Sequence, residues 1–211
     1  MQSHDPRDRR ALFALAVLCC AATAPAAHAE DYPVSGTISV GGQSGALPDG
    51  GVFAGASYDP ASGAIGAGAF VFPQTTASFD SDLGTVVVTY RLSQAGASGG
   101  QVGADGSAAL ATASMRLDVL HVTISGFPIA VGNCTFAPVE LDLAGSASAD
   151  ALDLADDGFT IPPVAPDDCG GFGGEIDDVI AGGDNAIALA IAGNFTPPAA
   201  DDAIFADGFD A

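Results

Sequence analysis

The chain has 211 residues, of which 26 are acidic and only 5 are Lys or Arg, so its formal net charge is −21 at pH 7. A surface this acidic has almost nothing with which to displace counterions from phosphate, which excludes nucleic acid as a partner and disfavours anionic lipid. The length is enough for one domain with a real core and a short tail.

The first 29 residues have the organisation of a secretory signal peptide. Three arginines among residues 7–10 form a positive segment, and an apolar run follows over 11–22. Ala27-His28-Ala29 then offers the small-x-small step that a signal peptidase cuts. The apolar run is too short to be a permanent membrane span. We therefore expect a mature protein that starts at Glu30 and is exported, either to the medium or to the cell envelope or periplasm.

Cleavage at this point makes the remaining chain more acidic. Arg91 and Arg116 are then the only cationic residues left, while 24 carboxylates remain because only Asp5 and Asp8 of the 26 leave with the leader. The net charge becomes −22. Such a charge favours solubility outside the cell, with cation binding as the alternative interpretation.

Apolar residues recur with a period of two along most of the mature chain. In residues 85–92, for example, Val88 and Tyr90 fall on one face of the predicted strand and Thr89 and Arg91 on the other. Similar patterns predict strands over 35–40, 52–58, 67–72, 139–143 and 187–191. Turn residues separate them at 48–51, 59–63 and 96–106. Helical signal is confined to residues 175–181, enough for two turns at most.

The alternation changes phase within residues 109–124. Apolar residues occupy odd positions up to Val119 and even positions from Leu120 onward. This switch predicts a β-bulge, or a strand that passes from one sheet to another. Many short strands separated by Gly and Pro predict an all-β fold, either an antiparallel β-sandwich or a partly open barrel.

Two cysteines, Cys134 and Cys169, remain after removal of the leader. A single pair in an exported chain most simply forms one disulfide. The rival interpretation, a reactive thiol pair, has no C-x-x-C spacing and no neighbouring cation to favour it.

The residues around these cysteines resemble a known group of proteins. Gly-Phe-Pro-Ile at 126–129 precedes Gly-Asn-Cys at 132–134, and Phe-Thr-Ile-Pro-Pro at 159–163 precedes Cys-Gly-Gly at 169–171. Gly-Asp-Asn follows at 183–185. This order and spacing, over roughly residues 83–192, is similar to secreted β-rich bacterial proteins that are common in actinomycetes and carry no assigned activity. The resemblance implies a disulfide-closed β domain and no catalytic residue.

Two segments concentrate carboxylates that suit calcium. Oxygen ligands in flexible loops match Ca²⁺ at extracellular concentrations, although no EF-hand loop is present. Calcium is the one cofactor that the sequence suggests, and the candidate ligands are Asp153, Asp156, Asp157, Asp177, Asp178 and Asp184.

The end of the chain differs from the rest in composition. Residues 196–202 are rich in Pro and Asp, and residues 203–211 read Ala-Ile-Phe-Ala-Asp-Gly-Phe-Asp-Ala. This ending is similar to the Ile-Phe-x-Asp-Gly-Phe-Glu tails of exported proteins from the Xanthomonas and Lysobacter group. It predicts either a frayed acidic tail or a sorting peptide, in which Ile204, Phe205 and Phe209 would contact an envelope or sorting partner. The expected organisation is a leader at 1–29, a β domain at 30–195 and a linker with tail at 196–211.

Catalytic motifs are scarce in the mature chain. His121 is its only histidine, and there is no Gly-x-Ser-x-Gly elbow, no P-loop and no set of His and Cys that could bind zinc. Glu140 and Asp142 share a strand face and could serve a glycosidase, but Trp, the usual sugar platform, is absent.

We therefore predict a secreted or envelope-associated, non-catalytic structural or binding module. A pilus-like polymer subunit and a carboxylate-dependent hydrolase are the alternatives. The first cysteine of a pilin would follow soon after an N-terminal donor strand, whereas Cys134 comes late.

Overall fold

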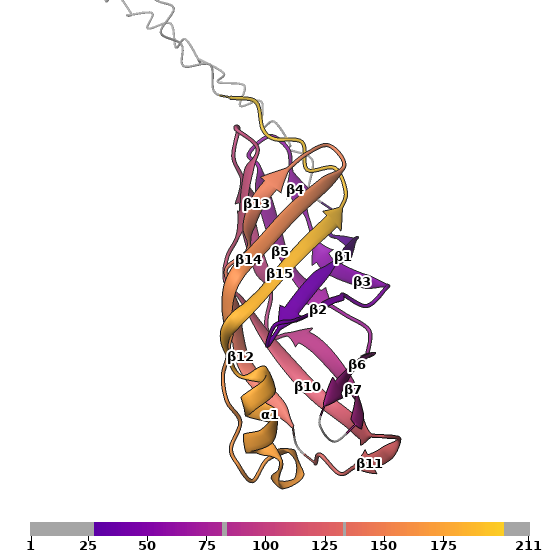
Figure 1. Cartoon of the computed structure of the whole chain (residues 1–211). Helices are drawn as coiled ribbons and strands as arrows, with labels where there is room; N and C mark the ends of the chain where they lie inside the picture. The colour runs from indigo at the N-terminus through magenta and orange to yellow at the C-terminus, as the bar shows by residue number, and fades with distance from the viewer. Residues whose placement is uncertain (1–27, 82–83, 133, 201–211) are drawn as a thin grey trace, which may run out of the picture.

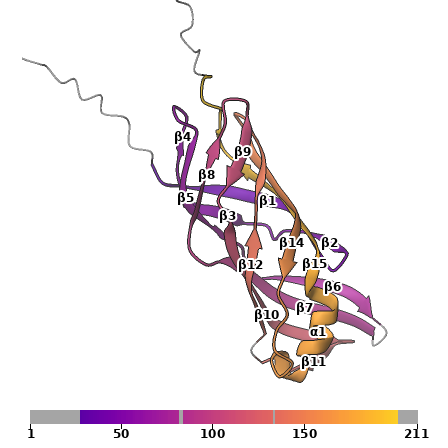
Figure 2. The same cartoon turned by 90° about the vertical axis from the view of Figure 1, so that its left-hand side faces the viewer.

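The computed structural model describes residues 28–200 apart from 82–83 and 133, and the described part is almost entirely antiparallel β-structure (Figure 1). Eight strands close into a barrel, and a second sheet continues from it toward the single α-helix (Figures 1 and 2). The predicted leader at 1–29, up to residue 27, and the tail from residue 201 lie outside the described residues.

The barrel consists of neighbours paired in a ring. In ring order its strands are β5 (Ala64–Val71), β3 (Gly51–Ala56), β1 (Glu30–Val40), β15 (Gly182–Ala192), β14 (Ala151–Ile161), β13 (Ala144–Ala147), β9 (Ser107–Leu110) and β8 (Ser98–Val102). Pairing between β8 and β5 closes the ring. The all-β, antiparallel prediction is confirmed, and the barrel is closed rather than partly open.

The second sheet joins the barrel through one pairing, between Val71 on β5 and Ser93 on β7. Its strands are β6 (Thr75–Ser81), β7 (Gly84–Gln94), β10 (Ala113–Ile124), β11 (Phe127–Ile129) and β12 (Thr135–Leu141). Two further short strands, β2 (Gln43–Ala46) and β4 (Tyr58–Asp59), pair with β1 and β5 respectively.

One continuous cluster of buried apolar side chains fills the barrel and extends over the inner face of the second sheet. Stacked and tilted rings of Phe53, Phe70 and Phe72 lie inside it, and Phe195, after the last strand, is fully buried against Tyr32 and Tyr58. Burying a ring such as that of Phe195 stabilises the fold by about 1.5–3 kcal/mol. The end of the chain's last strand is thereby fixed to the core.

The phase switch predicted in residues 109–124 is a β-bulge in β10. The register with β7 shifts between Val119 and His121, so Leu120 is the extra residue and is exposed. Val119 and Val122, on either side of the shift, are both buried. The prediction of a bulge is confirmed, while Leu120 itself faces solvent instead of the core.

Two segments differ from the sequence-based expectation. Residues 96–106, expected to be a turn, contain strand β8, and only the Asp105-Gly106 end forms the turn before β9. The acidic segment at 150–157, with carboxylates expected to bind calcium from a flexible loop, lies in β14 from Ala151 onward, where Leu152 and Leu154 are buried and Asp153 is exposed. Both strands escaped prediction because Gly and Asp are depleted in strands.

The disulfide between Cys134 and Cys169 is present, with both residues buried and their Cα atoms 4.3 Å apart. It ties the short 3-10 turn η1 (Cys169–Gly171) and the following α1 (Gly173–Ile180) to the start of β12. A side chain at Gly170 would meet the Ala130 carbonyl oxygen at 1.8 Å, and its φ of 70° favours glycine. The expected short helix is confirmed as α1.

No helix among the described residues is long and apolar enough to cross a membrane. After β15 the chain passes Phe195 and runs along the barrel end that lies away from α1 (Figures 1 and 2). There the Pro198 ring lies 3.1 Å from the position that a Cβ on Gly63 would take, in the turn between β4 and β5.

We expect Cys134→Ser to lower the free energy of unfolding by about 4 kcal/mol, because the bridge closes a loop of 35 residues and restricts the unfolded chain. Thermal melting of wild type and variant checks the loss. In the folded wild type, neither thiol should react with iodoacetamide without reductant. Quantitative alkylation under those conditions would contradict the bridge, and Cys169→Ser should match Cys134→Ser.

Candidate binding cleft

An apolar cleft of about 220 Å³ lies between the barrel, the second sheet and α1. Strand residues supply most of its walls: Ile38 and Val40 of β1, Val88, Tyr90 and Leu92 of β7, Leu117 and Val119 of β10, Val139 of β12, and Phe159 and Ile161 of β14. Val179 and Ile180 of α1 close one end, and its rim is formed by Gln43 to Gly45 of β2 and Ala77 to Phe79 of β6.

The period-two pattern of the strands produces this wall. Successive side chains of a strand point to opposite faces, so Val88, Tyr90 and Leu92 face the cleft while Arg91 is exposed on the other side. On β10, Leu117 and Val119 belong to the same wall, and the bulge at Leu120 keeps Val119 and Val122 buried on either side of the register shift.

The described residues that line the cleft carry no charged side chain. In a chain with a formal net charge of −21, this surface is free of carboxylates, and an unpaired charge buried in it would be costly. Burial raises the pKa of Tyr90 above its usual value, so this phenol keeps its proton at neutral pH and can act as a hydrogen-bond donor in the wall.

A buried asparagine holds the β1–β2 hairpin against the cleft. Asn185, which is 2% exposed, accepts a hydrogen bond from the Gly41 N–H at 3.1 Å. Its amide donates to the carbonyl oxygens of Phe159 at 3.2 Å and Gly182 at 2.8 Å. A side chain on Gly41 would meet the Val179 carbonyl oxygen at 2.1 Å, so α1 packs directly on the hairpin turn. The rim of the cleft is therefore fixed on one side.

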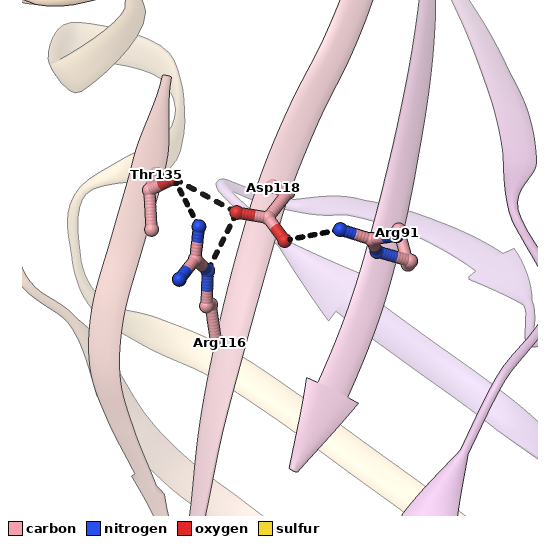
Figure 3. Close-up of polar contacts among 4 residues, drawn as sticks. All are labelled: Arg91, Arg116, Asp118 and Thr135. Atoms are coloured by element: carbon pink, nitrogen blue, oxygen red, sulfur yellow. Dashed lines mark hydrogen bonds and ion pairs between the residues drawn. The ribbon is translucent and has the colours of Figure 1, made fainter. Parts of the chain in front are cut away.

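The opposite face of the second sheet carries a polar cluster (Figure 3). Asp118 of β10, buried to 5% exposure, accepts hydrogen bonds from Arg116 Nε at 2.7 Å, Arg91 at 3.2 Å and the Thr135 hydroxyl at 2.8 Å. Arg116 also donates to the Thr135 hydroxyl oxygen at 3.2 Å. Both arginines of the described chain are thus used to neutralise one carboxylate.

These contacts shift the titration of Asp118. Burial by itself would raise the pKa of its carboxyl group, but the hydrogen bonds from Arg116, Thr135 and Arg91 and the charge of Arg116 together hold that pKa below its usual value. Asp118 is therefore ionised throughout the neutral range.

The carboxylates predicted to bind calcium are spread over β14, α1 and β15. Asp156 accepts the N–H groups of Asp142 and Gly158, and Asp177 accepts the N–H of Val164. The other four predicted ligands (Asp153, Asp157, Asp178 and Asp184) have exposed side chains. Within the part of the chain that the structure describes, no three His, Cys, Asp or Glu side chains are grouped to hold a metal ion. Calcium binding stays a prediction without a site.

Glu140, Asp142 and His121, which were also singled out in the sequence, do not line the cleft. Glu140 and Asp142 are exposed and accept hydrogen bonds from Ser114 and Thr112. His121 is exposed beside the bulge. Ile204, Phe205 and Phe209 of the tail lie outside the described residues.

Sequence reasoning did not find the cleft. Its wall residues follow the pattern of ordinary core positions, and nothing in that pattern separates a packed face from one that borders a cavity. The grouping of Arg91 and Arg116 around Asp118 was equally hidden, because it depends on the register between β7 and β10.

Comparison of the chain with protein-family models, with curated proteins and with solved structures finds no match.

We expect Asn185→Ala to destabilise the fold by about 1–3 kcal/mol, since it leaves the Gly41 N–H and two carbonyl oxygens without their buried partner. Urea unfolding measures the loss. Asn194→Ala is the matched control, because Asn194 is exposed and bonds only within its own turn. Equal losses for both variants would mean that Asn185 does not anchor the hairpin.

We expect Asp118→Asn to destabilise the protein at pH 7 by about 1.5–3 kcal/mol, the range for hydrogen bonds to charged groups. A folded-state pKa that lies below the unfolded value stabilises the fold above about pH 4, and this contribution is lost as the pH falls through the folded pKa. The difference in stability between wild type and Asp118→Asn should therefore become smaller at acidic pH.

Melting temperatures of both proteins between pH 7 and pH 2 check this. Asp157→Asn is the control, since it removes the same charge from an exposed side chain. A difference between wild type and Asp118→Asn that stays constant down to pH 2 would contradict the assignment.

Proposed function

We propose that this protein is a secreted or envelope-associated, non-catalytic binding module whose cleft holds an extended apolar ligand. The observation that carries the proposal is the cleft itself: a cavity of about 220 Å³ whose described lining residues are uncharged, in a chain with a net charge of −21. Ligand sites in proteins are typically concave and mostly apolar, with a few polar groups. Gln43, Ser44, Ser78 and Tyr90 are the polar groups here.

Export is supported by two features. The disulfide between Cys134 and Cys169 is typical of an oxidising, extracytoplasmic environment. The sequence of residues 1–29 adds the pattern of a signal peptide.

A carboxylate-dependent hydrolase receives less support. Glu140 and Asp142, its candidate acid and base, are exposed and do not line the cleft. No imidazole lines the cleft among the described residues either.

The neutral fluorescent probe N-phenyl-1-naphthylamine tests the proposal. It should bind the purified protein, and Ala77→Asp should weaken this binding at least tenfold, because it places a charge at the rim of an apolar site. Thr76→Asp is the matched control: it adds the same charge to the neighbouring residue of β6, which does not line the cleft. Absence of probe binding, or equal effects of the two variants, would overturn the proposal.

A further inference from the structure

Two unpaired strand edges face the same cleft. Among the described residues β2 pairs only with β1 and β6 only with β7, so Gln43 to Gly45 and Ala77 to Phe79 each have one edge without a described partner strand. Gln43 to Gly45 of β2 and Ala77 to Phe79 of β6 both line the cleft, and the two strands lie next to each other in both views (Figures 1 and 2). Open N–H and C=O groups on such edges can pair with an added strand.

The chain itself contains a segment that suits this place. Residues 201–211 read Asp-Asp-Ala-Ile-Phe-Ala-Asp-Gly-Phe-Asp-Ala. In an extended strand, Ile204, Ala206 and Gly208 form a small, uncharged stretch of one face, with Asp202 and Asp210 beyond its two ends, while Asp207 falls on the other face. An uncharged cleft can therefore receive this face over residues 203–209, with Asp202 and Asp210 left outside it.

We propose that the ligand of the cleft is residues 203–209 of this tail, supplied by a second copy of the protein and added as a β-strand between β2 and β6. The inference rests on the binding function proposed for the cleft and names its occupant. Each copy would donate a tail and accept one. Contacts of this head-to-tail kind generate rings or open chains of subunits.

The tail of the same copy is poorly placed for this role. Pro198 packs by the β4–β5 turn, at the barrel end away from α1, and six residues from there to Ile204 span at most about 22 Å. Ile38 of β1 pairs with Gly45 of β2 on one side and with Ile187 of β15 on the other, so Gly45 and Ile187 lie at the same position along the barrel. The stretch of β15 from Ile187 to Ala192 alone covers about 17 Å. Most of the length that these six residues can span is therefore needed to run along the barrel, and little is left to cross it to β2.

Charge sets the conditions for association. Each mature copy is strongly acidic, so approach of two copies is opposed by repulsion that salt screens, with a Debye length of about 30 Å at 0.01 M and about 8 Å at 0.15 M. Association should therefore strengthen as the ionic strength rises over this range. An association driven by attraction between opposite charges would instead weaken as the ionic strength rises.

Disulfide trapping tests the proposal with the full-length secreted protein. Ala77→Cys and Ile204→Cys are made as separate variants and mixed under mild oxidation at 0.15 M salt. The proposal predicts a disulfide-linked heterodimer on a non-reducing gel. Ala109→Cys replaces Ala77→Cys in the control mixture, since Ala109 is an exposed alanine on the barrel strand β9; this mixture should give at least tenfold less product.

Sedimentation equilibrium supplies a second measurement that does not depend on changes in the fold. Ile204→Asp should raise the dissociation constant of the wild-type assembly at least tenfold, whereas Ala203→Asp, with the same added charge on the other face of the strand, should not. A wild type that stays monomeric at high concentration and salt would overturn the proposal. So would equal trapping in the two mixtures, or a bridge that forms only within one chain when Ala77→Cys and Ile204→Cys are combined.

Failure here is separable from failure of the proposed function. If N-phenyl-1-naphthylamine binds and Ala77→Asp removes its binding, while no trapping or association occurs, the cleft is a binding site and the tail is not its ligand.

Discussion

The scarcity of positive charge is the constraint on which this structure depends. Arg91 and Arg116 are the only cationic residues between position 28 and position 200, so carboxylates cannot be neutralised by general ion pairing. The fold is held instead by one continuous apolar core, by the strand ladders and by a single covalent bridge. Both arginines are used for Asp118, the one carboxylate with a buried side chain among the described residues. A buried carboxylate without such partners would be costly, which explains why the two cations meet at one place.

The cleft follows from how the second sheet leaves the barrel. Strand β7 pairs with β5 at a single position and then continues with β6 and β10, so the two sheets diverge. Apolar side chains that would meet a facing sheet in a sandwich border a cavity here. Asn185 and the disulfide hold two adjoining parts of its boundary, the β1–β2 hairpin and the helix α1. These two anchors make the cleft a fixed feature of the fold.

Much of the fold could be predicted from the sequence, because alternation of apolar and polar residues directly reports strands with one buried face. This holds for β7 and for the bulge at Leu120, where the apolar positions change from odd to even numbers in the sequence. The strand β14 could not be predicted in this way. It carries Asp153, Asp156 and Asp157, and the register with β15 shifts between Asp156 and Phe159, so neither composition nor a constant period marks it. The cleft was harder still to predict from the sequence. A cavity forms where the apolar faces of two sheets do not meet, and this depends on how the sheets are assembled.

Open edges such as those of β2 and β6 normally invite uncontrolled pairing between molecules, and proteins protect them with Lys, Pro or inward-pointing charges. Strand β2 carries no charge, and β6 carries only Asp80 near its end. Two other features limit pairing at these edges. Repulsion between acidic surfaces opposes close approach of two copies, and both edges border one uncharged cleft. A narrow segment with one uncharged face can enter the cleft and brings little acidic surface close to the second copy. The edge of a second folded sheet can do neither. This selectivity links the acidity of the surface to the absence of charge in the cleft.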